Sequence, residues 1–189
     1  MFDVLRARAV RKAGDLLSRS PLRRFIRHQD GTSAIEFALV AVPFIALMFA
    51  IIETALVFFA GQTLEAAAAT ASRLILTGQA QSQGLSANAF KTKVCAQLTV
   101  MFDCTGGVYV DVKTYTTFAS TNMSSPVSNG NFDSSALTYT PGGPSDIVVM
   151  KLYYQWPIYV SLLNTGFANL NGNKRLLVAT SAFRNEPYK

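Results

Sequence analysis

The stretch that decides the fold of this chain runs from Gly31 to Ala60 and reads GTSAIEFALVAVPFIALMFAIIETALVFFA. Its residues 37–60 are apolar except for Pro43, Glu53 and Thr54. A helix over this range is about 36 Å long, enough to cross a hydrocarbon core of about 30 Å. A helix buried in a soluble protein would need a larger core than 189 residues usually build. The sequence therefore predicts a membrane-spanning helix at about residues 37–60.

The positive charge of the chain lies before this helix. The chain has 17 Lys and Arg against 11 Asp and Glu, a formal net charge of +6. Eight of the basic residues and three of the acidic ones fall within residues 1–31, so the remainder is close to neutral. Nucleic acid is therefore not predicted as a partner, because the basic character belongs to one terminal segment.

The same charge distribution predicts the orientation in the membrane. Basic residues collect on the cytoplasmic side of membrane helices, so the N-terminus is expected in the cytoplasm and the rest beyond the membrane. Residues 1–17 fit an amphipathic helix on anionic lipid and a disordered basic tail equally well. A secretory signal is not favoured, since the apolar segment is too long and no small-x-small site lies near Ala60. The same length, and the Phe25 that follows Arg23-Arg24, count against a twin-arginine signal.

An acid stands at the start of the apolar segment. A carboxylate inside such a segment costs about 2.5–3.5 kcal/mol on insertion scales, so Glu36 needs an explanation. One explanation is structural, because the dipole of the first helical turn favours negative charge. The other uses Gly31. If the chain is cut after this glycine, Thr32 becomes the N-terminus, and its ammonium can pair with Glu36 of its own chain or of a subunit packed in register.

Gly31, four residues and then Glu36-Phe37 together resemble the processing site of type IV prepilins. With the late acid Glu53 and the Ala-rich continuation LEAAAATASRLILTGQ, the chain is similar to the TadE-like pseudopilins of tight-adherence (Tad or Flp) pilus systems. YYQWPIYV at 153–160 and FRNEPY at 183–188 resemble them too. A start at Thr32 differs from major type IV pilins, which usually begin with Phe, and Glu-Phe differs from the Glu-Tyr of small Flp pilins. These differences and the chain's size favour a minor pilin or pseudopilin.

The resemblance implies a layout and a set of partners. Residues 1–31 would be a basic cytoplasmic prepilin leader, residues 32–80 a long helix, and residues 85–189 an exported domain. The implied partners are the membrane, a prepilin peptidase, other pilin and pseudopilin subunits and the inner-membrane assembly platform. The implied location is the bacterial inner membrane, single-pass with a periplasmic C-terminal domain, and the extracellular pilus after assembly.

Three functions remain open at this point. The first is a minor pilin cleaved after Gly31 and packed by its apolar helix into a Tad pilus or its initiation or tip complex, supporting pilus biogenesis and adherence. The second is an uncleaved single-span scaffold of the assembly platform. The third is a surface-binding protein, an adhesin in effect, which is compatible with the first.

The exported part is predicted to be a small α+β, pilin-like domain. The first helix continues to about Gln79 with an apolar stripe, and after the linker QAQSQGLS, Ser86 caps a second helix through Phe102. VYVDVKTYTTF, DIVVMKLYYQWPIYV and KRLLVATSAFRN predict three or four antiparallel strands packed on both helices. Pro157 is expected at a sheet edge or at the end of its strand.

Three further features of this part can be interpreted. Cys95 and Cys104 lie on the oxidising side and are expected to form a disulfide worth about 2 to 3 kcal/mol. Residues 120–146, rich in Ser, Asn and Gly, are expected to be a long surface loop, either a recognition surface or inert. Glu53 either reaches the headgroup region or bonds to a partner helix.

No enzymatic activity is predicted. The only histidine, His28, precedes the expected cleavage site, and the acids beyond the membrane are scattered without a motif around them. No phosphate-binding glycine loop occurs. The sequence therefore predicts no catalytic residue, no metal site and no cofactor.

Overall fold

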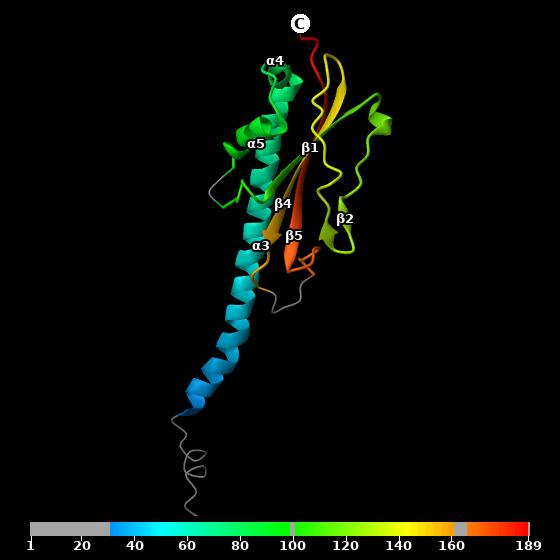
Figure 1. Ribbon diagram of the computed structural model, residues 1–189. Coiled ribbons are helices and arrows are strands. Elements are labelled where there is room, and N and C mark those ends of the chain that lie inside the picture. Colours follow the sequence, from blue (N-terminus) through cyan, green and yellow to red (C-terminus); the bar gives the residue numbers. More distant parts are fainter. Residues whose placement is uncertain (1–30, 99–100, 161–165, 189) are drawn as a thin grey trace, which may run out of the picture. The chain divides into compact units, whose positions relative to one another are not determined.

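The computed structural model describes residues 31–98, 101–160 and 166–188. The predicted leader and its amphipathic segment, at residues 1–30, lie outside the described residues. The chain divides into two units, residues 1–48 and 49–189, and one long helix, α3 (Thr32–Leu76), contributes to both. Figure 1 shows this helix beside the strands of the second unit.

In the first unit α3 is apolar and uncovered. No residue from Gly31 to Met48 is buried, and Pro43 lies within the helix. In the second unit α3 buries one face, with residues spaced three or four apart as the apolar stripe predicted. Its buried residues are Val57, Ala60, Leu64, Ala67, Ala68, Ala71, Ser72 and Ile75.

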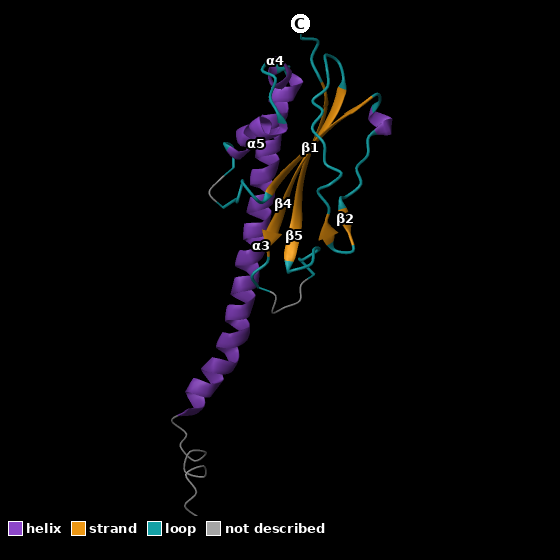
Figure 2. Cartoon of the chain, in the orientation of Figure 1, coloured by secondary structure: helices purple, strands orange, loops and turns teal. Residues whose placement is uncertain are grey.

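The second unit is built on a three-stranded antiparallel sheet of order β1-β4-β5. Its strands are β1 (Val108–Tyr115), β4 (Ile147–Pro157) and β5 (Lys174–Arg184), which are the three predicted runs (Figure 2). Pro157 is the last residue of β4 and pairs only with β5, because the pairing with β1 ends at Tyr154. The α+β class, with a long helix and a small sheet, is thereby confirmed.

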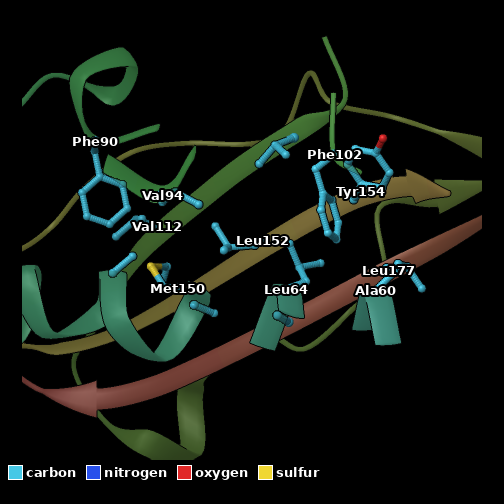
Figure 3. Packing of buried hydrophobic residues seen from close by; sticks show 14 of the residues in the cluster. Ala60, Leu64, Phe90, Val94, Phe102, Val112, Met150, Leu152, Tyr154 and Leu177 are labelled. Carbon is cyan, nitrogen blue, oxygen red and sulfur yellow. The ribbon is translucent and has the colours of Figure 1, made fainter. Parts of the chain in front are cut away.

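The core lies between the sheet and the two helices α3 and α5 (Ala87–Cys95). Figure 3 shows Leu64 of α3, Leu152 of β4 and Phe90 of α5 pointing into the same layer. A second, smaller cluster on Tyr153, Leu170 and Leu176 is joined by Phe132 and other partly buried residues. Phe132 also stacks near Tyr153, with ring centroids 5.5 Å apart.

The second helix is shorter than predicted. Ser86 caps it as expected, accepting from the Ala89 amide at 3.3 Å, but it ends at Cys95 instead of Phe102. A helix through residue 102 would carry the chain steadily away from Cys95, at about 1.5 Å per residue, and a disulfide cannot span such a separation. The two cysteines have Cα atoms 5.8 Å apart, so the chain must turn back between them. The predicted disulfide is thus incompatible with the predicted helix length.

Two segments predicted as irregular have more structure. The linker after α3 contains a helical turn, α4 (Gln79–Ser82), whose Ala80 is buried. The 120–146 segment, which follows the short 3-10 helix η2 (Phe118–Ser120), contains the hairpin β2 (Val127–Ser128) and β3 (Asn131–Phe132). Further along it, Val112 of β1 donates its N–H to the Thr138 carbonyl at 2.7 Å. Part of this segment therefore extends the edge of the sheet.

Candidate functional site

The largest uncommitted surface of the described chain is the apolar half of α3. The helix is long and apolar enough to cross a membrane, and its most apolar 18-residue window buries none of its residues in this chain. Large side chains such as Phe37, Leu39 and Phe44 are mostly exposed along it. Exposure of this much apolar surface in water is strongly unfavourable, so the half-helix requires lipid or another protein around it.

The residues predicted for processing and charge pairing lie at the start of this surface. Gly31 immediately precedes α3, Thr32 is its first residue, and Glu36 and Phe37 follow one turn later. All four are exposed, and Glu36 makes no hydrogen bond or ion pair with any described residue. Among residues 31–98, 101–160 and 166–188, Glu36 therefore has no partner.

Glu53, at the other end of the apolar run, has a partner within the chain. Its carboxylate accepts two backbone hydrogen bonds, from the Tyr159 N–H to Oε1 at 2.5 Å and from the Val160 N–H to Oε2 at 2.7 Å. These amides follow Pro157, where β4 has ended and no strand can accept from them. A carboxylate that accepts two amide hydrogens fixes this chain segment to α3. The sequence predicts that Glu53 reaches the headgroup region or bonds to a partner helix, and it does not predict this contact within the chain.

The position of Glu53 also marks where the domain begins to cover α3. Val57, one turn further on, is the first buried residue of the helix, and Ala60 follows it. The predicted span of 37–60 therefore includes a segment whose one face is already packed on the sheet. Residues 32–52, before this covered segment, form about 31 Å of helix at 1.5 Å per residue.

The disulfide holds the turn after α5 against the sheet. It joins Cys95, the last residue of α5, to Cys104. Beside it, the Tyr154 hydroxyl accepts from the Asp103 amide at 3.2 Å, and the Phe102 ring meets the Tyr154 ring edge-on at 4.8 Å. The bridge therefore stabilises the aromatic end of the core.

Charged residues on the outer face of the sheet hold the 120–146 segment in place. Asp111 of β1 accepts from the Thr138 amide at 2.9 Å and pairs with Lys113 at 3.1 Å. Lys151 of β4, which lies opposite Asp111, donates to the Asn122 carbonyl at 2.8 Å. Burial lowers the pKa of Lys151, partly offset by the charge of Asp111. These contacts hold the segment along the outer face of the sheet, while none of its residues is buried.

The sequence offered one signal for this network. Asp111 and Lys151 interrupt the apolar pattern of their strands, and a buried charge requires a partner. Their exact register could not be read from the sequence, because it depends on how β1 and β4 pair. The Glu53 contact had no comparable signal, since its partners are backbone amides that any residue supplies.

No arrangement for catalysis emerges from these contacts. Within the described ranges, no three His, Cys, Asp or Glu side chains lie close enough together to hold a metal ion. The described acids that are engaged accept from backbone amides, a neighbouring lysine or, for Glu65, the Gln62 side chain. The surfaces that remain are suited to contact with lipid or protein.

Comparison with known proteins identifies the helix. Residues 31–73 match the family model described as TadE-like protein. This part of the chain is TadE-like. The match begins at Gly31, includes Glu36 and Glu53, and ends within α3. No curated protein and no solved structure matches the chain. Beyond Gly31 the match covers α3 alone, and it suggests a Tad pilus-associated protein with an apolar helix.

Proposed function

We propose that this TadE-like chain is a minor pilin or pseudopilin of a Tad (Flp) pilus, cut after Gly31 by a prepilin peptidase. One observation carries the proposal. The family match starts at the glycine itself and continues along a half-helix that this chain leaves bare. The bare half-helix would hold the subunit in the inner membrane and then pack among other pilin and pseudopilin subunits in the pilus or its initiation or tip complex.

We place the membrane span at residues 32–52. The domain covers α3 from Val57 onward, so lipid cannot surround the helix there. About 31 Å of helix remains before Glu53, which matches a hydrocarbon core of about 30 Å. The basic leader would lie in the cytoplasm and residues 53–189 in the periplasm, where the disulfide is stable.

The charge pair at the start of the span would set the stagger between subunits. After cleavage, the Thr32 ammonium lies one helical turn from Glu36, whose carboxylate has no described partner. In low dielectric, any stagger that separates these charges leaves both of them unpaired. Recruitment by the assembly platform would place the subunit in the growing fibre, where it supports adherence.

The test is the N-terminal peptide of the membrane-extracted protein, read by mass spectrometry. We expect a mature terminus at Thr32 that disappears in Gly31→Ala. The matched control is Gly61→Ala. Gly61 lies within α3, and an added Cβ there meets no atom within 4 Å. A terminus that stays at Met1 in the wild type would favour the uncleaved scaffold of the assembly platform over the pilin.

Adhesion by the 120–146 segment is a second proposed function, and it is compatible with a minor pilin. Met123 is exposed, as is Phe118 just before the segment. Deletion of the segment is not a clean test, because Asp111 and Lys151 would lose their partners. Met123→Ser tests it better: lost attachment with normal fibres supports adhesion, and unchanged attachment contradicts it.

A further inference from the structure

The end of the domain next to the bare half-helix carries exposed aromatic and basic side chains. We call this set the collar and define it as Phe58, Phe59, Tyr159 and Lys174. Phe58 is 68% exposed, Phe59 54% and Tyr159 78%, unusually high values for large apolar side chains in a folded domain. Something other than water is therefore expected to cover them.

Hydrogen bonds hold the collar at one level of α3. Glu53 binds the backbone of Tyr159, and Ile158 beside it donates to the Asn173 carbonyl at 2.9 Å. The Asn173 side chain returns a bond to the Ile158 carbonyl at 2.8 Å, and Lys174 is paired with Pro157. Tyr159 and Lys174 are thus fixed at the level where, by the proposed function, α3 leaves the hydrocarbon core.

The dimensions fit the polar layer of a bilayer. The headgroup region adds about 5–7 Å on each side of the hydrocarbon core. The helix rise from Glu53 to Phe58 is about 7.5 Å. Tyr159, an aromatic side chain with a polar end, suits this layer, and so does a lysine whose stem lies along apolar surface. The Phe58 and Phe59 rings, which lack a polar end, suit the boundary between headgroups and acyl chains.

Charge favours an anionic surface. Lys174 is exposed and forms no ion pair with a described residue. The neighbouring Arg175 is committed within the chain, because its Nη1 donates to the Phe167 carbonyl at 3.1 Å. Two acids lie at this end of the domain, and both are engaged. Glu53 accepts from two backbone amides. Asp103, which lines the same pocket as Lys174, accepts from the Thr105 and Gly106 amides. Lys174 is therefore the charge that the collar presents outward.

From these contacts we propose that the collar lies in the headgroup layer and binds anionic phospholipid, so that the domain rests on the membrane surface before assembly. The proposal rests on the membrane anchor of the proposed function. It assigns Glu53 the role of a positioning residue, which keeps Tyr159 at the height of the headgroups.

The experiment reconstitutes the full chain in vesicles at low protein density and labels single cysteines with an environment-sensitive fluorophore. The native cysteines are bridged and do not react without reductant. Labels at Phe44→Cys, Tyr159→Cys and Phe118→Cys report on the span, the collar and the far part of the domain. Nitroxides on the acyl chain or on the headgroup serve as quenchers.

We expect acyl-chain nitroxide to quench the label at Phe44→Cys. Headgroup nitroxide should quench the label at Tyr159→Cys severalfold more than the label at Phe118→Cys. The fluorescence of the label at Phe118→Cys should stay near its value in water. If Tyr159→Cys behaves like Phe118→Cys while Phe44→Cys is quenched, the collar proposal is wrong and the anchor stands. If Phe44→Cys is not quenched, the anchor itself fails and the collar with it. If the label at Tyr159→Cys is quenched or shielded from water only at high protein density, the collar contacts a second copy of the chain and the proposal is overturned.

A charge variant tests the lipid class. Lys174→Glu should reduce the headgroup quenching of Tyr159→Cys in vesicles of phosphatidylcholine with phosphatidylglycerol, and leave it unchanged in phosphatidylcholine alone. The matched control is Lys93→Glu, an exposed lysine of α5 that lies outside the collar. An equal loss in both variants, or no loss in either, contradicts binding of anionic headgroups at Lys174.

Discussion

The replacement of Glu53 by alanine separates two effects of one carboxylate. Removing the charge should leave insertion no weaker, because Glu53 lies just beyond the proposed span of residues 32–52. It also removes the acceptor of two backbone amides, those of Tyr159 and Val160. Hydrogen bonds to a charged group contribute about 1.5–3 kcal/mol each. Because Glu53 is half-buried, the lower value applies, and the local cost is about 3 kcal/mol.

The assay is hydrogen exchange, followed by mass spectrometry of peptides that cover residues 153–160 in the reconstituted protein. A loss of about 3 kcal/mol corresponds to exchange of the Tyr159 and Val160 amides about 100-fold faster in Glu53→Ala. Glu53→Gln keeps one acceptor oxygen but turns an amide donor toward the other N–H, so its effect should be intermediate. Membrane extraction with carbonate should show insertion no weaker than in the wild type.

The control is Glu65→Ala, an exposed acid of the same helix whose one described hydrogen bond, from Gln62, is 3.4 Å long. It should leave the exchange of residues 153–160 unchanged. If Glu53→Ala also leaves it unchanged, the carboxylate does not hold this segment. Normal exchange together with impaired fibre assembly would instead return Glu53 to the role of a contact between subunits.

Three other predictions concern separate parts of the chain. Replacing both Cys95 and Cys104 by Ser should lower the free energy of unfolding by about 2.7 kcal/mol and the Tm by about 10 °C relative to the oxidised wild type, measured by circular dichroism, and should match the reduced wild type; a Tm equal to that of the oxidised wild type would show that the bridge is dispensable. Glu36→Ala should insert normally but give few fibres, counted by electron microscopy with Glu65→Ala as control, and normal fibre numbers would contradict the charge register. Burial raises the pKa of Tyr153 to about 12, above the ordinary 10.0, so the unfolded chain loses the phenol proton at a lower pH than the folded chain. The free energy of unfolding should therefore fall between about pH 10 and 12. Tyr153→Phe should flatten this part of the pH profile, and an unchanged slope in that variant would contradict the role of Tyr153.

Local patterns in the sequence predicted most of the architecture. The three strands followed from their β-branched and aromatic runs, and the buried face of α3 from the three-and-four spacing between Leu64 and Ile75. Ser86 was sufficient to place the start of α5. These features depend on neighbours a few residues away, which the sequence displays directly.

The features that sequence reasoning missed depend on distant contacts. The end of α5 is set by the bridge to Cys104, and the order of the 120–146 segment by its contacts with Asp111 and Lys151. Its high content of Ser, Asn and Gly indicated a loop, yet Leu137 and Phe132 pack on the second, smaller cluster of buried residues around Tyr153. Composition indicated a surface loop but did not show its contacts with the charged strand positions.

The closing contacts of the domain have a consequence for its synthesis. After β5 the chain returns to the end of α3, where the Glu186 amide donates to the Leu76 carbonyl at 2.9 Å. There the Tyr188 ring lies against Gly78, where a Cβ would come within 2.4 Å of it; the φ of 76° also suits glycine. The helix emerges from the ribosome first, and β5, the strand that completes its packing, begins 98 residues after the helix ends, at Lys174 against Leu76. If the domain is exported as proposed, the apolar stripe of α3 therefore stays without its partner strand until the end of the chain has crossed the membrane.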